Sequence, residues 1–308
     1  MRFTDDMRRY AAYLPAHLRE SVEAPRSTWF GWRGRSVHIA RGGDPDAPVR
    51  GILVHGGGGY TAALWPMTGV ALPGTEVLAP DLPLYGYTTE PRPAAVRYGD
   101  WVDLLCDIVL AEHRRDGKPL VLFGASMGGM LAYEAAARTG VVSAVLATCL
   151  LDTRDPEARS AAARFGWLGR HGEFLLNAVR PLLGPVRVPI RWLADMSAMS
   201  RDPGLARLCA TDPRGGGASV PLGFLASWFG FAHTPPEKYR GAPVTLVAPV
   251  ADTWTPPELS QRFLQRISAP TQTVLLDNCG HYPIEEPGLT QLAEAGRAAV
   301  RAVLEQAG

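Results

Sequence analysis

The chain has 308 residues, a formal net charge of +1, and hydrophobic residues at 46% of its positions. A chain of this length can bury a large core in one domain, or in one domain with an insertion. The near-zero net charge gives no indication of a nucleic-acid or anionic-membrane partner, and the longest apolar run, residues 141–151, is too short to span a bilayer.

The four cysteines are scattered and form no Cys-x-x-Cys pair. Buried thiols are their expected state, which favours a cytoplasmic protein. Residues 1–25 mix charges with apolar residues at helical spacing, so they predict a helical segment and not a secretory signal. Because no two histidines stand at ligand spacing, no metal site is predicted, and nothing in the sequence calls for a cofactor.

Two short strands, 28–32 and 36–41, open the chain as a hairpin, and from there strands and helices alternate. The further strands are expected at 51–54, 76–79, 120–123, 143–150, 244–247 and 273–276, and the clearest helices at 98–114, 127–138, 256–267 and 288–306. Short apolar strands that alternate with helices predict an α/β fold, in which helices cover both faces of a mostly parallel central sheet.

Residues 152–240 break this alternation with helical fragments, many prolines and a dense set of aromatic and methionine side chains. A loop of that length without structure would be unusual in a compact domain, so the stretch is predicted to be a helical cap insertion. The expected organisation is an N-terminal helical segment (1–25), a core in two parts (26–151 and 241–308) and the cap between them. Within the cap, the run Gly215-Gly216-Gly217 is expected to be a mobile segment.

A Gly-x-Ser-x-Gly motif, Gly124 to Gly128, stands between a predicted strand and the helix that follows it. A sharp turn at this place forces the central residue, Ser126, into strained backbone angles and needs glycines two residues to either side. The strain lifts the hydroxyl clear of the sheet, beside a helix N-terminus. Ser126 is therefore predicted to be a nucleophile, with a plain helix N-cap as the alternative.

A serine hydroxyl needs a base and an orienting carboxylate to act as a nucleophile at neutral pH. Asp252 and His281 each follow the end of a predicted strand, where open α/β sheets assemble their sites. The chain order Ser, Asp, His is that of the nucleophile-elbow enzymes. Ser126, Asp252 and His281 are thus the predicted catalytic triad, and Asp152, which also follows a strand, is the alternative acid.

Four glycines, Gly56 to Gly59, follow the third predicted strand. Acyl transfer needs two backbone N–H donors aimed at the oxyanion that develops, and these are expected from Gly57 and from Met127. A dinucleotide phosphate loop, with Asp81 as the ribose-binding acid, is the alternative. His55, before the glycines, is expected to be a structural hydrogen-bonding residue.

Substrate contacts are expected from the glycine loop and from aromatic side chains of the cap and of the loop around the predicted acid. They are Gly58, Tyr60, Trp192, Trp228 and Trp254. These residues, with the methionines of the insertion, predict a mainly apolar pocket.

The chain resembles the α/β-hydrolase-fold serine hydrolases with a helical cap, of the esterase, lysophospholipase and monoacylglycerol-lipase kind. The resemblance covers nearly all of the chain outside the N-terminal helix. The segments that carry it are His55-Gly56-Gly57-Gly58-Gly59, Pro80-Asp81-Leu82-Pro83, Gly124-Ala125-Ser126-Met127-Gly128-Gly129, Asp252-Thr253-Trp254-Thr255-Pro256 and Gly280-His281-Tyr282-Pro283. It implies the same triad, with Gly57 and Met127 as the oxyanion donors.

Two departures limit what the resemblance implies. Leu84-Tyr85-Gly86-Tyr87 stands where the family usually has a Gly-His-Gly-like turn, so the family's pocket residues on that side do not carry over. The cap is the family's most variable part, so the identity of the substrate does not carry over either.

The sequence therefore predicts a hydrolase of carboxylic esters, thioesters or lactones that acts on a small hydrophobic acyl substrate through an acyl-serine intermediate. Two alternatives stay open: an acyltransferase or cyclase that uses the same triad, and a non-catalytic ligand-binding protein on the same fold. Reactions with an aspartate nucleophile are disfavoured because the motif carries Ser126. For the assembly, a homodimer is one alternative.

Overall fold

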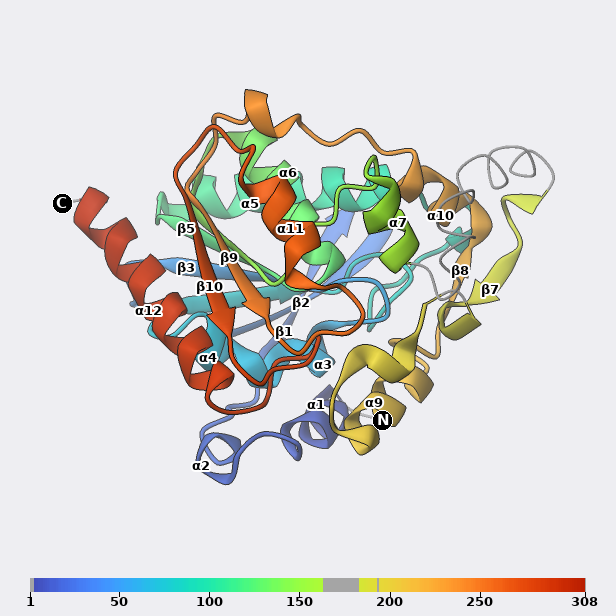
Figure 1. Ribbon diagram of the computed structural model, residues 1–308, viewed down its shortest axis with the longest axis horizontal. Helices are drawn as coiled ribbons and strands as arrows, with labels where there is room; N and C mark the ends of the chain where they lie inside the picture. Colours follow the sequence, from blue (N-terminus) through green and yellow to red (C-terminus); the bar gives the residue numbers. More distant parts are fainter. Residues whose placement is uncertain (1–2, 163–182, 193, 308) are drawn as a thin grey trace.

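The computed structural model describes residues 3–162, 183–192 and 194–307. Residues 163–182 of the predicted cap thus lie outside the described residues. Figure 1 shows a twisted central sheet with helices on both sides. Within the described ranges, none of the helices combines the length and the apolar character needed to cross a membrane.

An eight-stranded sheet forms the centre of the molecule, in the order β1-β2-β4-β3-β5-β6-β9-β10. Its strands are β1 (Arg26–Trp32), β2 (Arg35–Gly43), β3 (Arg50–Val54), β4 (Glu76–Pro80), β5 (Leu120–Gly124), β6 (Val142–Ala147), β9 (Val244–Pro249) and β10 (Thr271–Leu276). The pairs β1–β2 and β2–β4 are antiparallel, and all other neighbours in this sheet are parallel. The predicted mostly parallel α/β sheet is confirmed, with the opening hairpin as its antiparallel edge.

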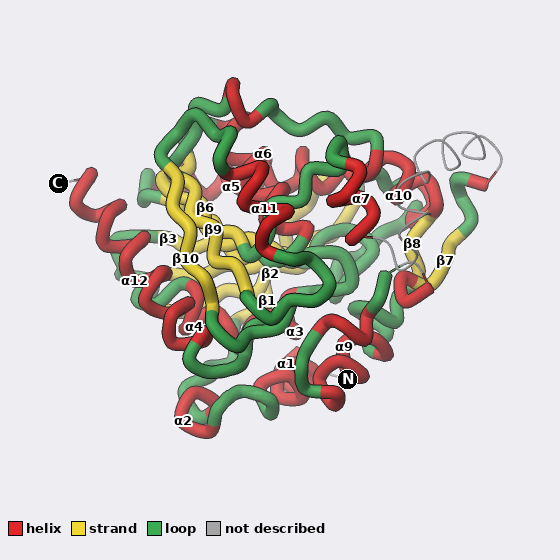
Figure 2. The backbone as a smooth tube through the Cα atoms, viewed as in Figure 1, coloured by secondary structure: helices red, strands yellow, loops and turns green. Residues whose placement is uncertain are grey.

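Helices cover the two faces of the sheet, as Figure 2 shows by element type. On one face α12 (Gly288–Ala307) packs along β10 and beside the short α4 (Thr68–Ala71). On the other face α5 (Tyr98–Asp116) and α6 (Met127–Thr139) lie side by side, and α11 (Pro257–Leu264) packs on β9. The helices therefore follow the alternation expected from the sequence.

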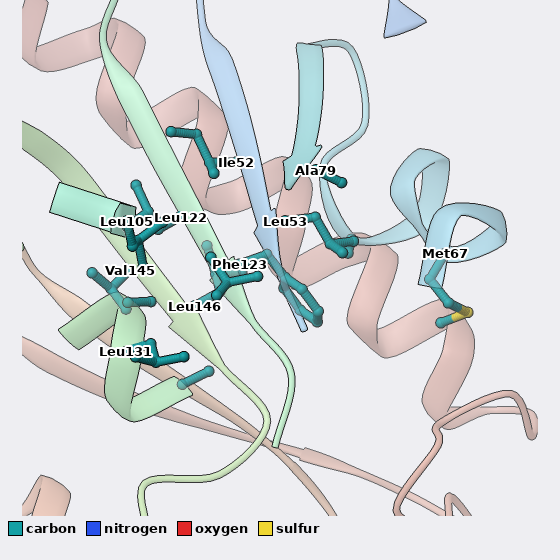
Figure 3. Packing of buried hydrophobic residues seen from close by; sticks show 14 of the residues in the cluster. Ile52, Leu53, Met67, Ala79, Leu105, Leu122, Phe123, Leu131, Val145 and Leu146 are labelled. Atoms are coloured by element: carbon teal, nitrogen blue, oxygen red, sulfur yellow. The ribbon is translucent and has the colours of Figure 1, made fainter. Parts of the chain in front are cut away.

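The central strands are buried on both faces. Every residue of β3 and β5 is buried, as expected for parallel strands between two layers of helices. Figure 3 shows side chains of these strands packed together with Leu105 of α5 and Leu131 of α6. Interiors packed this closely resist deformation, so the residues that follow the ends of these strands are held in fixed positions.

The side chain of Arg50 is charged and yet fully buried at the start of a central strand. Arg50 opens β3 with 0% exposure, and its guanidinium donates to Glu76 at 2.8 Å and to Asp116 at 2.9 Å. The carboxylate of Glu112 lies 3.4 Å away. These partners offset the cost of burying the charge, and they lie at the edge of the sheet where the parallel strands begin.

The N-terminal segment forms two short helices, α1 (Phe3–Ala11) and α2 (Ala16–Arg19). Helix α1 packs on α3 (Thr61–Leu64). The apolar residues at helical spacing lie on its inner face, where Met7 and Tyr10 are buried.

The range predicted to be the cap contains helices and, in addition, a two-stranded antiparallel ribbon. Its elements are α7 (Pro156–Ala162), β7 (Arg187–Pro189), η3 (Ile190–Trp192), η4 (Met196–Met199), α9 (Pro203–Thr211), β8 (Ser219–Pro221), α10 (Leu222–Phe229) and η5 (Pro236–Lys238). The label η marks short 3-10 helices. Before the predicted cap, the described chain has η1 (Trp65–Met67) and η2 (Pro93–Ala95). Strands of three residues carry no periodic signal, so the ribbon was not predictable from the sequence.

Candidate active site

Ser126 occupies a strained turn between β5 and α6. Its backbone angles are φ 54° and ψ −127°, a region that residues with a side chain rarely adopt. A Cβ on Gly124 would lie 2.3 Å from the carbonyl oxygen of Gly128, and a Cβ on Gly128 would lie 2.2 Å from that of Val54. The turn therefore requires glycine at both positions, for the steric reason inferred from the motif.

His281 and Asp252 form a buried pair. Nδ1 of His281 lies 2.7 Å from Oδ2 of Asp252, and the two residues are 7% and 5% exposed. The other carboxylate oxygen, Oδ1, accepts from the backbone N–H groups of Trp254 at 2.8 Å and Thr255 at 3.0 Å. The hydroxyl of Thr255 donates to Oδ2 at 2.7 Å. The carboxylate thus has a defined partner for each oxygen.

These hydrogen bonds favour the ionised form of Asp252. Burial alone would raise the pKa of Asp252, but the hydrogen bonds from His281 and Thr255 outweigh it and hold that pKa below its usual value. An ionised Asp252 accepts the Nδ1–H of His281, and in the neutral imidazole with this tautomer Nε2 carries the lone pair. Nε2 is buried, and it has no protein hydrogen-bond partner among the described residues.

Asp152, the alternative acid, is engaged elsewhere. Both of its carboxylate oxygens accept from the guanidinium of Arg154, with Nε at 3.0 and 3.1 Å and Nη2 at 2.9 Å. Of the two candidate acids, the structure brings only Asp252 into contact with His281.

His55 fixes the peptide between Gly56 and Gly57. Its Nε2 accepts from the backbone N–H of Leu82 at 2.9 Å, so Nδ1 carries the proton and donates to the carbonyl oxygen of Gly56 at 2.8 Å. Burial lowers the pKa of His55, so the ring is neutral, as this arrangement requires. Carbonyl and N–H point in opposite directions across a trans peptide, so the N–H of Gly57 is turned away from His55.

The glycine loop lies directly against the turn that carries Ser126. A Cβ on Gly56 would lie 2.9 Å from Cβ of Ser126 and 3.0 Å from the backbone nitrogen of Met127. Within the part of the chain that the structure describes, the N–H groups of Gly57 and Met127 donate to no protein acceptor. Two donors with no partner therefore stand beside the serine, as an oxyanion site needs.

Asp81 is fully occupied by protein groups. Its Oδ1 accepts from the N–H of Thr61 at 2.7 Å, and its Oδ2 accepts from the N–H of Tyr87 at 2.8 Å and lies 2.9 Å from Nδ1 of His38. A ribose-binding acid needs a carboxylate oxygen that is open to the ligand. Asp81 instead anchors the start of α3 and the Leu84–Tyr87 turn, so the geometry does not favour a dinucleotide loop.

A pocket brings the predicted residues together. Ser126, His281, Gly57 and Gly58 all line it. Much of its remaining wall is apolar and includes Ala63, Leu64, Met67, Phe123, Met199 and Tyr282. No hydrogen bond joins the hydroxyl of Ser126 to His281 in the described structure, and such contacts commonly tighten only when substrate binds.

Residues 52–295 match the model of the alpha/beta hydrolase family. The chain belongs to that family. The matched range contains the glycine loop, Ser126, Asp252 and His281, but it leaves out the whole N-terminal segment.

Solved structures with the same fold agree with this membership. Monoglyceride lipase from Saccharomyces cerevisiae is 15% identical, with a TM-score of 0.70 over 92% of this chain and 95% of that one. Monoacylglycerol lipase from Paleococcus ferrophilus is 21% identical, with a TM-score of 0.66 over 87% and 98%. An esterase from Rhodococcus sp. is 16% identical, with a TM-score of 0.57 over 91% and 100%. At these identities the likeness establishes the fold alone, and no curated protein sequence matches the chain.

The aromatic residues expected at the substrate are placed differently in this alpha/beta hydrolase. Of the five expected contacts, Gly58 lines the pocket, whereas the described lining does not include the four aromatic ones. Tyr60 is fully buried behind the loop, Trp192 is 60% exposed, and the ring of Trp228 packs on Phe229 at 4.8 Å. The ring of Trp254 lies 4.7 Å from that of His281, and Trp254 is not among the described residues of the pocket wall.

Three residues of the site were not singled out from the sequence. Thr148 accepts the backbone N–H of Ser126 at 2.8 Å, and Thr255 supports the carboxylate of Asp252 as described above. Tyr10 of α1 lines the pocket. The two threonines follow a strand end or a turn close to the predicted motifs, and this position in the sequence could have marked them as residues of the site. For Tyr10 the sequence showed only the spacing of a buried helix face.

Proposed function

We propose that this alpha/beta hydrolase is a serine hydrolase that cleaves a carboxylic ester of a small hydrophobic substrate. One observation carries the proposal above the others. The imidazole of His281 has its Nδ1 on Asp252 and an unpartnered, buried Nε2 in the same pocket as Ser126. That is the arrangement in which a histidine acts as a general base towards a serine.

In the proposed reaction, Oγ of Ser126 attacks the ester carbonyl carbon while Nε2 of His281 takes the hydroxyl proton. The ionised Asp252 stabilises the imidazolium that forms. The carbonyl oxygen becomes an oxyanion and accepts from the N–H groups of Gly57 and Met127. His281 then protonates the departing alcohol. Water repeats the sequence on the acyl-serine, releases the acid and restores the hydroxyl of Ser126.

The pocket supports an apolar substrate, since α3, η1 and the predicted cap contribute carbon surfaces to its wall, and Phe123, Tyr282 and Pro283 add further ones. The titles of the structural neighbours name lipases of monoglycerides and an esterase, and ester hydrolysis is the reaction they have in common. Thioesters and lactones use the same acyl chemistry, so they belong to the same proposed range. No cofactor or metal enters the proposed reaction.

The cap over the site is part of the proposal. Residues 152–240 supply Met199 and Cys209 to the pocket. A Cβ on Gly215 would lie 2.8 Å from the carbonyl oxygen of Gly58, so this stretch touches the glycine loop directly. We therefore assign to it the role of excluding water from the acyl-enzyme.

A panel of p-nitrophenyl esters of increasing chain length, followed by thioesters and lactones, tests the proposal together with labelling by a fluorophosphonate probe. We expect label on Ser126 and a specificity constant that rises from acetate to medium-length esters, by up to about fourfold for each methylene group buried. Transfer of the acyl group to added alcohols in place of water would instead support the acyltransferase alternative. Absence of both labelling and turnover in folded protein would leave the non-catalytic alternative.

A further inference from the structure

The wall of the pocket includes a side chain from outside the segment that defines the family. Tyr10 of α1 lines the pocket together with Met199 and Cys209, yet the family match begins only at residue 52. Figure 1 shows α1, near the N-terminus, beside α9 of the predicted cap. The N-terminal helix therefore reaches the site between the core and the cap.

The phenol of Tyr10 is held in one position. Its hydroxyl donates to Oδ2 of Asp212 at 3.0 Å, and the hydroxyl of Tyr60 donates to the same oxygen at 2.9 Å. The two rings meet edge to face, with centroids 6.1 Å apart and planes at 80°, a favourable geometry for aromatic pairs. Tyr10 is only 3% exposed, so its ring is fixed by contacts on several sides.

Asp212 joins three parts of the chain. It follows directly after α9, is 1% exposed, and its Oδ1 accepts from the N–H of Arg214 at 3.0 Å. The guanidinium of Arg9, on α1, lies 3.7 Å from Oδ2. Burial, above all, raises the pKa of Tyr10 far beyond its usual value, so the phenol remains a neutral donor to this carboxylate. One buried acid thus connects the N-terminal helix, Tyr60 after the glycine loop, and the predicted cap.

We propose that Tyr10 is a specificity-determining residue, whose ring closes the apolar part of the pocket and limits the length of the group that binds there. The proposal rests on the function proposed above. A ring held by a buried hydrogen bond is a rigid wall, because moving it would leave the donor and part of the Asp212 carboxylate unpaired. The N-terminal helix is then part of the substrate site and not an appendage to the core.

The test compares Tyr10→Ala and Tyr10→Phe with the wild type on p-nitrophenyl butyrate, octanoate and dodecanoate. Tyr10→Ala removes the wall, so the ratio of kcat/KM for dodecanoate to that for butyrate should rise by about tenfold or more, since each methylene that newly fits adds up to about fourfold. Tyr10→Phe keeps the ring but loses the hydrogen bond that holds it, so its ratio should rise much less than that of Tyr10→Ala. Tyr10→Leu, which shortens the side chain but stays apolar, should shift the ratio in the same direction and replaces Tyr10→Ala if that variant does not fold.

Tyr13→Ala is the matched control, because Tyr13 lies just after α1, faces Gly204 of α9 and is not among the described residues that line the pocket. An unchanged ratio in folded Tyr10→Ala or Tyr10→Leu, or an equal shift in Tyr13→Ala, would overturn the proposal. Affinities of unbranched methyl ketones of the same lengths, measured by calorimetry, give a readout without turnover. If the wild type hydrolyses no ester, the proposed function fails, and the ketone affinities still show whether Tyr10 limits chain length.

Discussion

Nδ1 of His55 donates to the carbonyl oxygen of the next residue, Gly56, at 2.8 Å. This contact sets the orientation of a whole peptide unit, and with it the direction of the Gly57 N–H. A histidine outside the described pocket lining thereby orients the N–H of Gly57, which lines the pocket. The ring of Tyr85 packs edge-on against that of His55, with centroids 5.8 Å apart. The Leu84–Tyr87 segment, which departs from the family pattern, thus packs on the histidine that orients the glycine loop.

His55→Gln should therefore lower kcat by about 10²–10³, the usual effect of losing one oxyanion donor, and change KM little. Affinity for a trifluoromethyl ketone, whose adduct with the serine uses the same donors, should fall in parallel. His233→Gln is the matched control, since His233 is a buried histidine on the hydroxyl of Tyr98 at 3.1 Å, away from the glycine loop. Equal losses in the two variants would show that His55 has no positioning role.

Ser126→Ala should leave the fold intact and reduce ester turnover by about 10⁶, the loss seen when a serine nucleophile is removed. Labelling by a fluorophosphonate should disappear with it, whereas Ser268→Ala, at an exposed serine, should keep both. Retention of more than about a tenth of the wild-type rate would mean that another group attacks the ester.

Asp252→Asn should lower kcat by about 10⁴, because an amide neither holds the imidazole in the reactive tautomer nor stabilises its charged form. The hydrogen bonds that hold the pKa of Asp252 below its usual value keep the carboxylate ionised through neutral and mildly acidic pH, so the loss should persist across that range. Asp152→Asn breaks only the local pair with Arg154 and should cost less than about tenfold. A larger loss in Asp152→Asn would reverse the assignment of the acid.

The parts of the site that follow from the sequence are those with a local steric or topological cause. Glycine at 124 and 128 is required by the turn around Ser126, and His281 follows a strand end, so both could be read from short segments. The choice between Asp252 and Asp152 could not, because both follow strands and only the path of the later loops brings one of them to His281.

The glycines of the predicted cap have a steric cause that the sequence does not reveal. In Gly215-Gly216-Gly217, which is expected to be mobile, a Cβ on Gly216 would lie 2.4 Å from the carbonyl oxygen of Cys209, and one on Gly217 would lie 2.8 Å from that of Asp212. Close packing selects for glycine as strongly as flexibility does. The contact of Tyr10 with the pocket could not be predicted either. The spacing of Tyr10 in the sequence indicates that it lies on the buried face of a helix, but not which part of the molecule packs on that face.

Arg50→Met should destabilise the protein by about 3–5 kcal/mol at neutral pH, because it removes the fully buried cation that pairs with the buried carboxylates of Glu76 and Glu112. The hydrogen bond from Arg50 lowers the pKa of Asp116 to about 2. Burial would raise the pKa of Glu76, but Arg50 and Lys118 outweigh it and lower that pKa. A carboxylate whose pKa is lower in the folded than in the unfolded protein stabilises the fold at any pH above its unfolded pKa, which is about 4. This stabilisation is lost as the pH falls through the pKa of the folded protein. The gap in unfolding free energy between wild type and variant, measured by urea titration, should therefore narrow from about pH 4 towards pH 2.

The matched control is Arg33→Met, which removes an exposed pair with Asp103 and should cost no more than about 1 kcal/mol of unfolding free energy. If Arg50→Met costs no more unfolding free energy than Arg33→Met, or if its cost does not change with pH, the stabilising role of Arg50 and its carboxylate partners is contradicted.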